Sequence, residues 1–124
     1  HTGKLAAKIA ACEAVDVALG RLVDAIERAH GVIVVTADHG NADDMALRDK
    51  QGRPLKDAQG RVQARTSHTL APVPFAIAGP GLSSSVRVRH DLKTPGLANI
   101  AATVLNLLGF EAPDGYEPTL LELG

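Results

Sequence analysis

The stretch Val32-Ile-Val-Val-Thr-Ala-Asp38-His39-Gly40-Asn41 decides how the rest of the chain is interpreted. Its uninterrupted Val/Ile run is typical of a strand buried on both faces of a parallel sheet. Asp38 and His39 follow directly, at the carboxyl end of the strand, where open α/β sheets bind their ligands. A purely structural turn, with Asp38 accepting backbone hydrogen bonds and His39 in solvent, would have the same sequence.

Helical periodicity precedes this strand. Residues 4–30 contain no proline and place apolar residues at steps of three and four, which predicts one long helix. We expect Gly31 to end it in the left-handed conformation. Seven residues form the predicted buried stripe: Leu5, Ile9, Cys12, Val15, Leu19, Leu22 and Ile26. Cys12 is therefore expected to be a buried core thiol.

Further elements follow the opening stretch. Residues 73–78 are a predicted second strand and residues 86–88 a brief third one. Thr94-Pro95 predicts the start of a second helix, and Gly109 predicts its end. Its expected buried face is Leu97, Ile100, Ala101, Val104, Leu107 and Leu108, and the tail is expected to pack through Phe110, Tyr116 and Leu120. Helices and strands in this order predict an α/β fold.

Length and charge narrow the function classes. A chain of 124 residues predicts one domain with its own core. The formal net charge of −1 gives no electrostatic case for binding nucleic acid or an anionic membrane. A single cysteine excludes an internal disulfide and favours a reducing compartment. Neither a signal peptide nor an apolar run of about 18 residues is present, so we expect a cytoplasmic protein.

Residues 48–65 are almost entirely polar, and they contain Asp-x-x-Gly twice, ending at Gly52 and Gly60. This composition predicts an exposed hairpin excursion outside the core. Its Arg and Lys side chains are of the type that meets an anionic substrate, but a solvated loop is the simpler interpretation.

Carboxylates and imidazoles gather near the ends of the predicted elements. The candidate ligands are His1, Asp38, His39 and His68. Divalent metals of the zinc and manganese type take these ligands, and paired metals clamp the oxygens of a phosphoryl transfer. The neighbouring acids Asp43-Asp44 would repel one another without a cation, although a solvated acidic turn has the same composition.

Thr36-Ala-Asp-His-Gly-Asn-Ala42, with Thr66-Ser-His-Thr69 and Pro72-Val-Pro74 after it, resembles the C-terminal part of the cofactor-independent phosphoglycerate mutases. His1-Thr2-Gly3 ahead of the long helix matches this family too, and the resemblance covers essentially the whole chain. The family belongs to the alkaline phosphatase superfamily. The resemblance implies that residues 1–124 are a single partial domain, contributing to a three-layer α/β/α sheet of the metal-binding phosphatase domain.

The resemblance also implies a metal centre with two Mn2+ ions. Asp38 and His39 correspond to the pair that holds one manganese together with a serine nucleophile, and His1 and His68 hold the other. The implied reaction interconverts 3-phosphoglycerate and 2-phosphoglycerate through a phosphoserine. The nucleophile and the substrate-binding domain have no counterpart in this sequence. The expected partner is therefore the remaining N-terminal part of the enzyme, and the chain alone is expected to be inactive.

Two other interpretations remain open. Phosphopentomutases and metal-dependent phosphatases of the same superfamily share the Asp-His-Gly core, although Asn41-Ala42 favours the phosphoglycerate enzymes. Alternatively, the chain is a non-catalytic α/β module in which Asp38-His39 is a structural turn. The residues that select the substrate lie outside this sequence in either enzyme.

Overall fold

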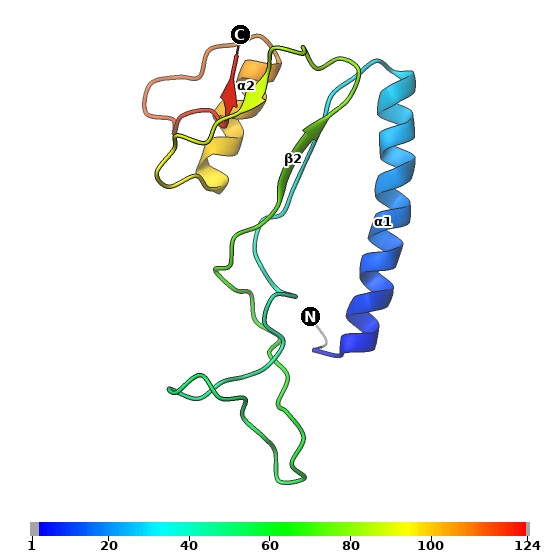
Figure 1. Cartoon of the computed structure of the whole chain (residues 1–124), viewed down its shortest axis with the longest axis vertical. Coiled ribbons are helices and arrows are strands. Elements are labelled where there is room, and N and C mark those ends of the chain that lie inside the picture. Colours follow the sequence, from blue (N-terminus) through cyan, green and yellow to red (C-terminus); the bar gives the residue numbers. More distant parts are fainter. Residues whose placement is uncertain (1–2, 124) are drawn as a thin grey trace. The chain divides into compact units, whose positions relative to one another are not determined.

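A computed structural model describes residues 3–123, which fall into two compact units divided between Gly79 and Pro80 (Figure 1). The first unit contains α1 (Leu5–Arg28), β1 (Ile33–Thr36) and β2 (Phe75–Ala78). The second contains β3 (Arg87–Val88), the 3-10 helix η1 (Leu97–Asn99), α2 (Ile100–Leu107) and β4 (Leu121–Glu122). This mixture of helices and strands agrees with the coarse part of the fold prediction, a structure built from both element types. The three-layer sheet and the single domain over residues 1–124 stay predictions.

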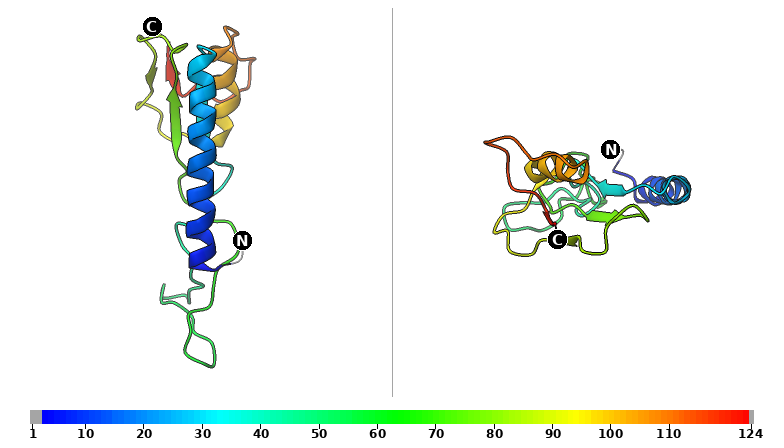
Figure 2. Two further views of the ribbon diagram at one scale, coloured as in Figure 1. Left: turned by 90° about the vertical axis from the view of Figure 1, so that its right-hand side faces the viewer. Right: turned by 90° about the horizontal axis from the view of Figure 1, so that it is seen from above.

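α1 is one unbroken helix of 24 residues, as the periodicity predicts (Figure 2). A Schellman motif ends it: the N–H of His30 donates to the Glu27 carbonyl at 3.1 Å, and that of Gly31 to the Ile26 carbonyl at 2.9 Å. His30 has a φ of 50°, so His30 rather than Gly31 is the left-handed residue. The prediction for Gly31 is wrong because α1 ends at Arg28 rather than at residue 30, which places the left-handed residue one position earlier.

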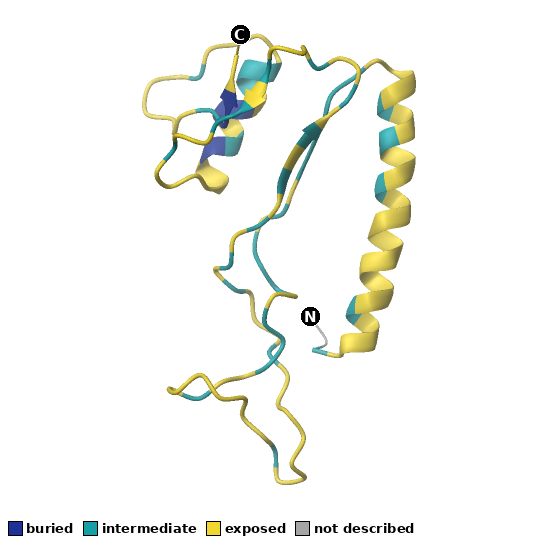
Figure 3. Ribbon diagram, in the orientation of Figure 1, coloured by how far each residue is buried: buried dark blue, intermediate teal, exposed yellow. Residues whose placement is uncertain are grey.

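The apolar stripe of α1 is largely uncovered. None of its residues is buried, and Leu5 and Val15 are 63% and 65% exposed. Cys12 is also exposed, so the prediction of a buried core thiol is wrong. Four residues of α1 are half-buried, and they are Lys8, Leu19, Val23 and Ile26. The teal segments of the α1 ribbon in Figure 3 lie along its edge nearest the β1–β2 pair. The described residues therefore cover only part of the apolar stripe of α1.

β1 and β2 pair antiparallel, with Ile33 opposite Ala78 and Thr36 opposite Phe75. Both strands lie where the sequence predicts them. The parallel, fully buried environment expected for the first strand is wrong within the described residues, because β2 is antiparallel and β1 is only half buried. Gly79, at a φ of 126°, lies so close to the Gly31 carbonyl oxygen that a Cβ atom would overlap it.

A branched arrangement of two hairpins follows the turn after β1. The N–H groups of Leu47, Leu55 and Gln63 donate to the carbonyls of Gln63, Leu47 and Leu55 respectively, at 2.7–2.9 Å. These three bonds close a cyclic junction from which both hairpins project. Each hairpin turn has the sequence Asp-x-Gln-Gly-Arg, ending at Arg53 or Arg61. This segment is the polar excursion predicted at residues 48–65, and most of its side chains are exposed.

The buried interior of the second unit is centred on the hydroxyl group of Thr103. Its buried residues are Asn99, Ala102, Thr103, Leu120 and Leu121. The Thr103 hydroxyl donates to the Asn99 carbonyl at 2.7 Å and accepts from the Leu120 N–H at 2.9 Å. This hydroxyl therefore ties α2 to the chain entering β4, which pairs antiparallel with β3. Burial of Thr103 costs little because both hydrogen-bonding functions are satisfied.

The predicted buried face of the second helix is wrong. Val104 and Leu108 are 39% and 66% exposed, and Leu97 lies in η1 rather than α2. The small side chains on another face of α2 are buried instead, against the segment that carries Leu120.

The tail is only partly as expected. Leu120 is buried, but Phe110 and Tyr116 are 63% and 51% exposed. Gly109 ends α2 with a φ of 84°, as predicted. No helix in the described part of the chain is long and apolar enough to cross a membrane.

Candidate metal centre

Asp38 and His39 lie in the turn that follows β1. The His39 Nδ1 lies 3.1 Å from the Gly40 carbonyl oxygen, which can only accept, so Nδ1 carries the proton of this hydrogen bond. That tautomer leaves Nε2 with a lone pair. Nε2 is 3.5 Å from the Asp38 Oδ1, and the Asp38 side chain is 88% exposed. Two electron-rich ligand atoms therefore lie side by side at an open surface.

His68 comes from the segment before β2 and joins this turn. Its ring stacks on that of His39, with centroids 3.5 Å apart and ring planes at 9°. The two histidines are 29 positions apart in sequence, yet their rings are in contact. Among the predicted ligands, the structure therefore shows two pairwise contacts, His39 with Asp38 and His39 with His68.

His1, the fourth predicted ligand, lies outside the described residues. Among residues 3–123, no group of three or more His, Cys, Asp or Glu side chains is arranged so that it could hold a metal ion. The assignment of His1, Asp38, His39 and His68 as ligands therefore stays a prediction.

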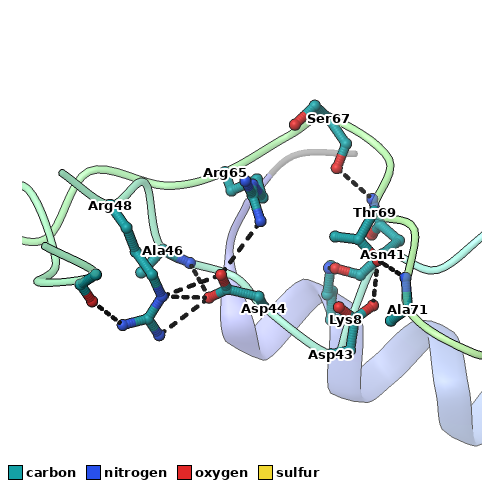
Figure 4. A network of polar contacts seen from close by, with 11 residues as sticks. Lys8, Asn41, Asp43, Asp44, Ala46, Arg48, Arg65, Ser67, Thr69 and Ala71 are labelled. Atoms are coloured by element: carbon teal, nitrogen blue, oxygen red, sulfur yellow. Dashed lines mark hydrogen bonds and ion pairs between the residues drawn. The ribbon is translucent and has the colours of Figure 1, made fainter. Parts of the chain in front are cut away.

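Hydrogen bonds join the two loops that carry the histidines (Figure 4). The Thr69 N–H donates to the Gly40 carbonyl at 2.8 Å, and the Asn41 amide donates to the Ser67 carbonyl at 3.4 Å. Lys8 of α1 donates from Nζ to the Asn41 carbonyl at 2.9 Å. These contacts fix the turn after β1 against both α1 and the segment before β2.

Asp43 and Asp44, which follow the turn, both interact with other side chains of the protein. Asp43 accepts the Thr69 hydroxyl at 2.7 Å. Asp44 pairs with Arg48 at 3.0 Å and with Arg65 at 3.2 Å. The hydrogen bond from Arg48 lowers the pKa of the Asp44 carboxyl, with help from the Ala46 N–H and the charge of Arg65. The acidic turn therefore reaches local charge balance without a cation.

Sequence reasoning missed Lys8 and Thr69. Lys8 is one of only two lysines in the predicted helix, and nothing in its spacing indicates a contact with residue 41. Thr69 adjoins a predicted ligand, but its bonds to Gly40 and Asp43 span 29 and 26 positions. Only the antiparallel return of the chain brings these groups together.

One pair of predicted ligand atoms has a spacing that suits a divalent metal. Two ligands bonded at about 2.0–2.2 Å to one ion, at a near-tetrahedral angle, lie about 3.4 Å apart. The 3.5 Å between His39 Nε2 and Asp38 Oδ1 agrees with that spacing. A backbone carbonyl that holds Nδ1–H is also the usual orienting partner of a metal-binding histidine.

Comparison with known proteins agrees with this chemistry. Residues 1–112 match the metalloenzyme superfamily. The chain belongs to the metalloenzyme superfamily. Over 99% of its length it is 61% identical to 2,3-bisphosphoglycerate-independent phosphoglycerate mutase 1 of Arabidopsis thaliana. It is 55% identical over the same share to the corresponding mutase of Trypanosoma brucei.

A solved structure extends the similarity to three dimensions. The phosphoglycerate mutase of Leishmania mexicana, crystallised at low cobalt concentration, matches the whole chain with a TM-score of 0.92 and 56% identity. The chain spans about 22% of the length of the curated metalloenzyme relatives and 23% of the Leishmania chain. The predicted resemblance to cofactor-independent phosphoglycerate mutases is confirmed.

Proposed function

We propose that this metalloenzyme chain supplies part of the dimetal centre of an enzyme that interconverts 3-phosphoglycerate and 2-phosphoglycerate. The observation that carries the proposal is the contact of His39 with both Asp38 and His68, in a chain 55–61% identical to such mutases. The remaining part of the catalytic domain, with the serine nucleophile, is the proposed partner. A cytoplasmic location goes with this proposal, because the substrate is a phosphorylated central metabolite.

Each residue has a distinct role in the proposal. Asp38 and His39 would hold one metal through Oδ1 and Nε2, while His68, with His1, would hold the second. When bound, the metals supply Lewis-acid stabilisation of the phosphoryl group and lower the pKa of the nucleophile. The backbone carbonyl of Gly40 keeps the His39 ring in the metal-binding tautomer. Manganese is the proposed metal, and cobalt is a second candidate because the Leishmania relative was crystallised with it.

A segment exchange tests the proposal. This chain replaces the matching 23% of the Leishmania mexicana enzyme, and ³¹P NMR follows the conversion of 3-phosphoglycerate in the presence of Mn2+. We expect 2-phosphoglycerate from the exchanged enzyme and none from the isolated chain. Asp38→Ala and His39→Ala should abolish turnover, whereas His90→Ala should retain it, because His90 is an exposed histidine in the other unit.

The same assay separates the alternatives. Release of inorganic phosphate without 2-phosphoglycerate would favour a metal-dependent phosphatase. Full mutase activity in the Asp38→Ala and His39→Ala enzymes would instead support a structural turn.

A further inference from the structure

The two histidine loops are held together by contacts that lie just beyond the proposed ligands. Gly40 and Thr69 follow His39 and His68 directly, and they form an isolated antiparallel bridge. The bond from the Thr69 N–H to the Gly40 carbonyl is 2.8 Å long. A displacement of this bridge would therefore separate the two stacked rings.

A side-chain hydrogen bond reinforces the bridge. The Thr69 hydroxyl donates to the Asp43 Oδ1 at 2.7 Å, and its oxygen accepts from the Ala71 N–H at 3.4 Å (Figure 4). The hydroxyl thus links the turn after β1 with the segment that leads into β2. A hydrogen bond to an ionised carboxylate is stronger than one between neutral groups.

Glycine at position 40 makes this close approach possible. A Cβ atom there would lie 2.8 Å from the Asp43 Oδ1 and would overlap the Thr69 hydroxyl. The Asp43–Thr69 bond therefore crosses over the backbone of residue 40. The absence of a side chain at that residue is a condition for the bond.

We propose that Asp43 and Thr69 are positioning residues that hold His39 against His68 in the geometry the metals require. The inference rests on the metal-site proposal above for its functional meaning, but it concerns the arrangement of two side chains of this chain. The Thr69 hydroxyl acts through Asp43 and Gly40 on the spacing of the rings, and neither Asp43 nor Thr69 binds metal. Groups that orient metal ligands in this way typically contribute 10–100-fold to metal affinity.

The first test needs no metal. In the purified chain, NMR should find the imidazole protons of His39 and His68 upfield of their values in the urea-unfolded chain, because the rings stack. Thr69→Val replaces the hydroxyl with a methyl group of similar size and should abolish this upfield shift, whereas Thr69→Ser keeps the hydroxyl and should retain the shift. Thr66→Val is the matched control in the same loop, because no hydrogen bond of the Thr66 hydroxyl is found among the described residues. Amide signals of β1 and β2 report whether each variant is folded.

The second test titrates the same proteins with Mn2+ and follows the paramagnetic broadening of the imidazole protons. The Mn2+ concentration at half-broadening should rise about tenfold in Thr69→Val and should be unchanged in Thr69→Ser and Thr66→Val. If Thr69→Val fails to fold, Asp43→Ala replaces it in both tests, because the Asp43 side chain is exposed; we expect the same effect. Asp43→Asn should have a smaller effect, because it keeps an acceptor oxygen.

The outcomes separate the two proposals. Unchanged ring shifts in folded Thr69→Val or Asp43→Ala would overturn the positioning role, whatever the metal does. Loss of the ring shifts without any response of the wild-type chain to Mn2+ would support the positioning role and contradict the metal site.

Discussion

His30 and Gly109 occupy the same position at the ends of α1 and α2. In both helices the N–H groups of this residue and of the residue after it close a Schellman motif, to Glu27 and Ile26 in α1 and to Asn106 and Leu105 in α2. His30 has a φ of 50° and Gly109 a φ of 84°. The left-handed region is costly for a residue with a Cβ atom and free for glycine. His30 is therefore a point of local backbone strain.

Replacing His30 with glycine should stabilise the chain. We expect His30→Gly to raise the free energy of unfolding by about 0.5–1 kcal/mol, since relief of the left-handed strain exceeds the added entropy of the unfolded chain. Urea denaturation followed by circular dichroism measures the change. The reciprocal variant Gly109→His should lower the free energy of unfolding by a similar amount. Equal stability of His30→Gly and the parent chain would show that His30 is not strained.

At the scale of single residues, the sequence predicts what is local. Asp38 and His39 are adjacent in the chain, and their position after an apolar run is enough to place them at a strand end. Gly109 is likewise predicted from local sequence to end α2, because a glycine directly follows the helical pattern. The stacking of His39 on His68 depends on a chain return of 29 positions, and no local pattern encodes it.

The twin hairpins show a repeated element that composition alone did not resolve. In each turn one aspartate accepts the N–H groups two and four positions later and pairs with the arginine side chain, Asp49 with Arg53 and Asp57 with Arg61. The Arg53 and Arg61 N–H groups lower the pKa values of Asp49 and Asp57 below their ordinary value of 3.8. Both turns therefore depend on an ionised carboxylate.

This dependence predicts acid-induced opening of the turns. Because the pKa values are depressed in the folded turns, the stabilisation is present above pH 3.8 and is lost as the pH falls through the lower folded values. Amide chemical shifts of Arg53 and Arg61, recorded from about pH 6 to about pH 2, should report apparent pKa values below 3.8. Asp57→Asn should remove the transition at Arg61 and leave the one at Arg53. Midpoints above 3.8 at both amides would contradict the structure.

Among the larger elements, α1 was predictable in extent but not in environment. Its apolar steps of three and four and its lack of proline define a helix, and the observed Leu5–Arg28 lies inside the predicted 4–30. Burial is a different property, because it depends on which surface lies opposite. The same limit explains α2, where the buried face follows Leu120 and Thr103 rather than the largest apolar residues.

The whole molecule presents more apolar surface than its own units cover. Along α1, Ile9 and Leu22 are 51% and 58% exposed and lie on the predicted stripe. The chain also spans only about 22% of the curated relatives it resembles. In the proposed complete enzyme, the remaining polypeptide would cover this stripe. The isolated chain has no such cover among its described residues, and exposed apolar patches of this kind favour association.

The isolated chain should therefore self-associate through the stripe of α1. We expect sedimentation velocity to show a concentration-dependent increase in the sedimentation coefficient of the parent chain. The double variant Ile9→Lys and Leu22→Lys should sediment as a monomer, because charged side chains cannot be buried in an apolar contact without a large desolvation cost. Val17→Lys is the matched control, since Val17 is equally open at 58% exposure but lies off the stripe, and it should associate like the parent. A parent chain that stays monomeric at all concentrations would show that the uncovered stripe does not mediate self-association. Association abolished equally by Val17→Lys would show that general charge, rather than the stripe, controls it.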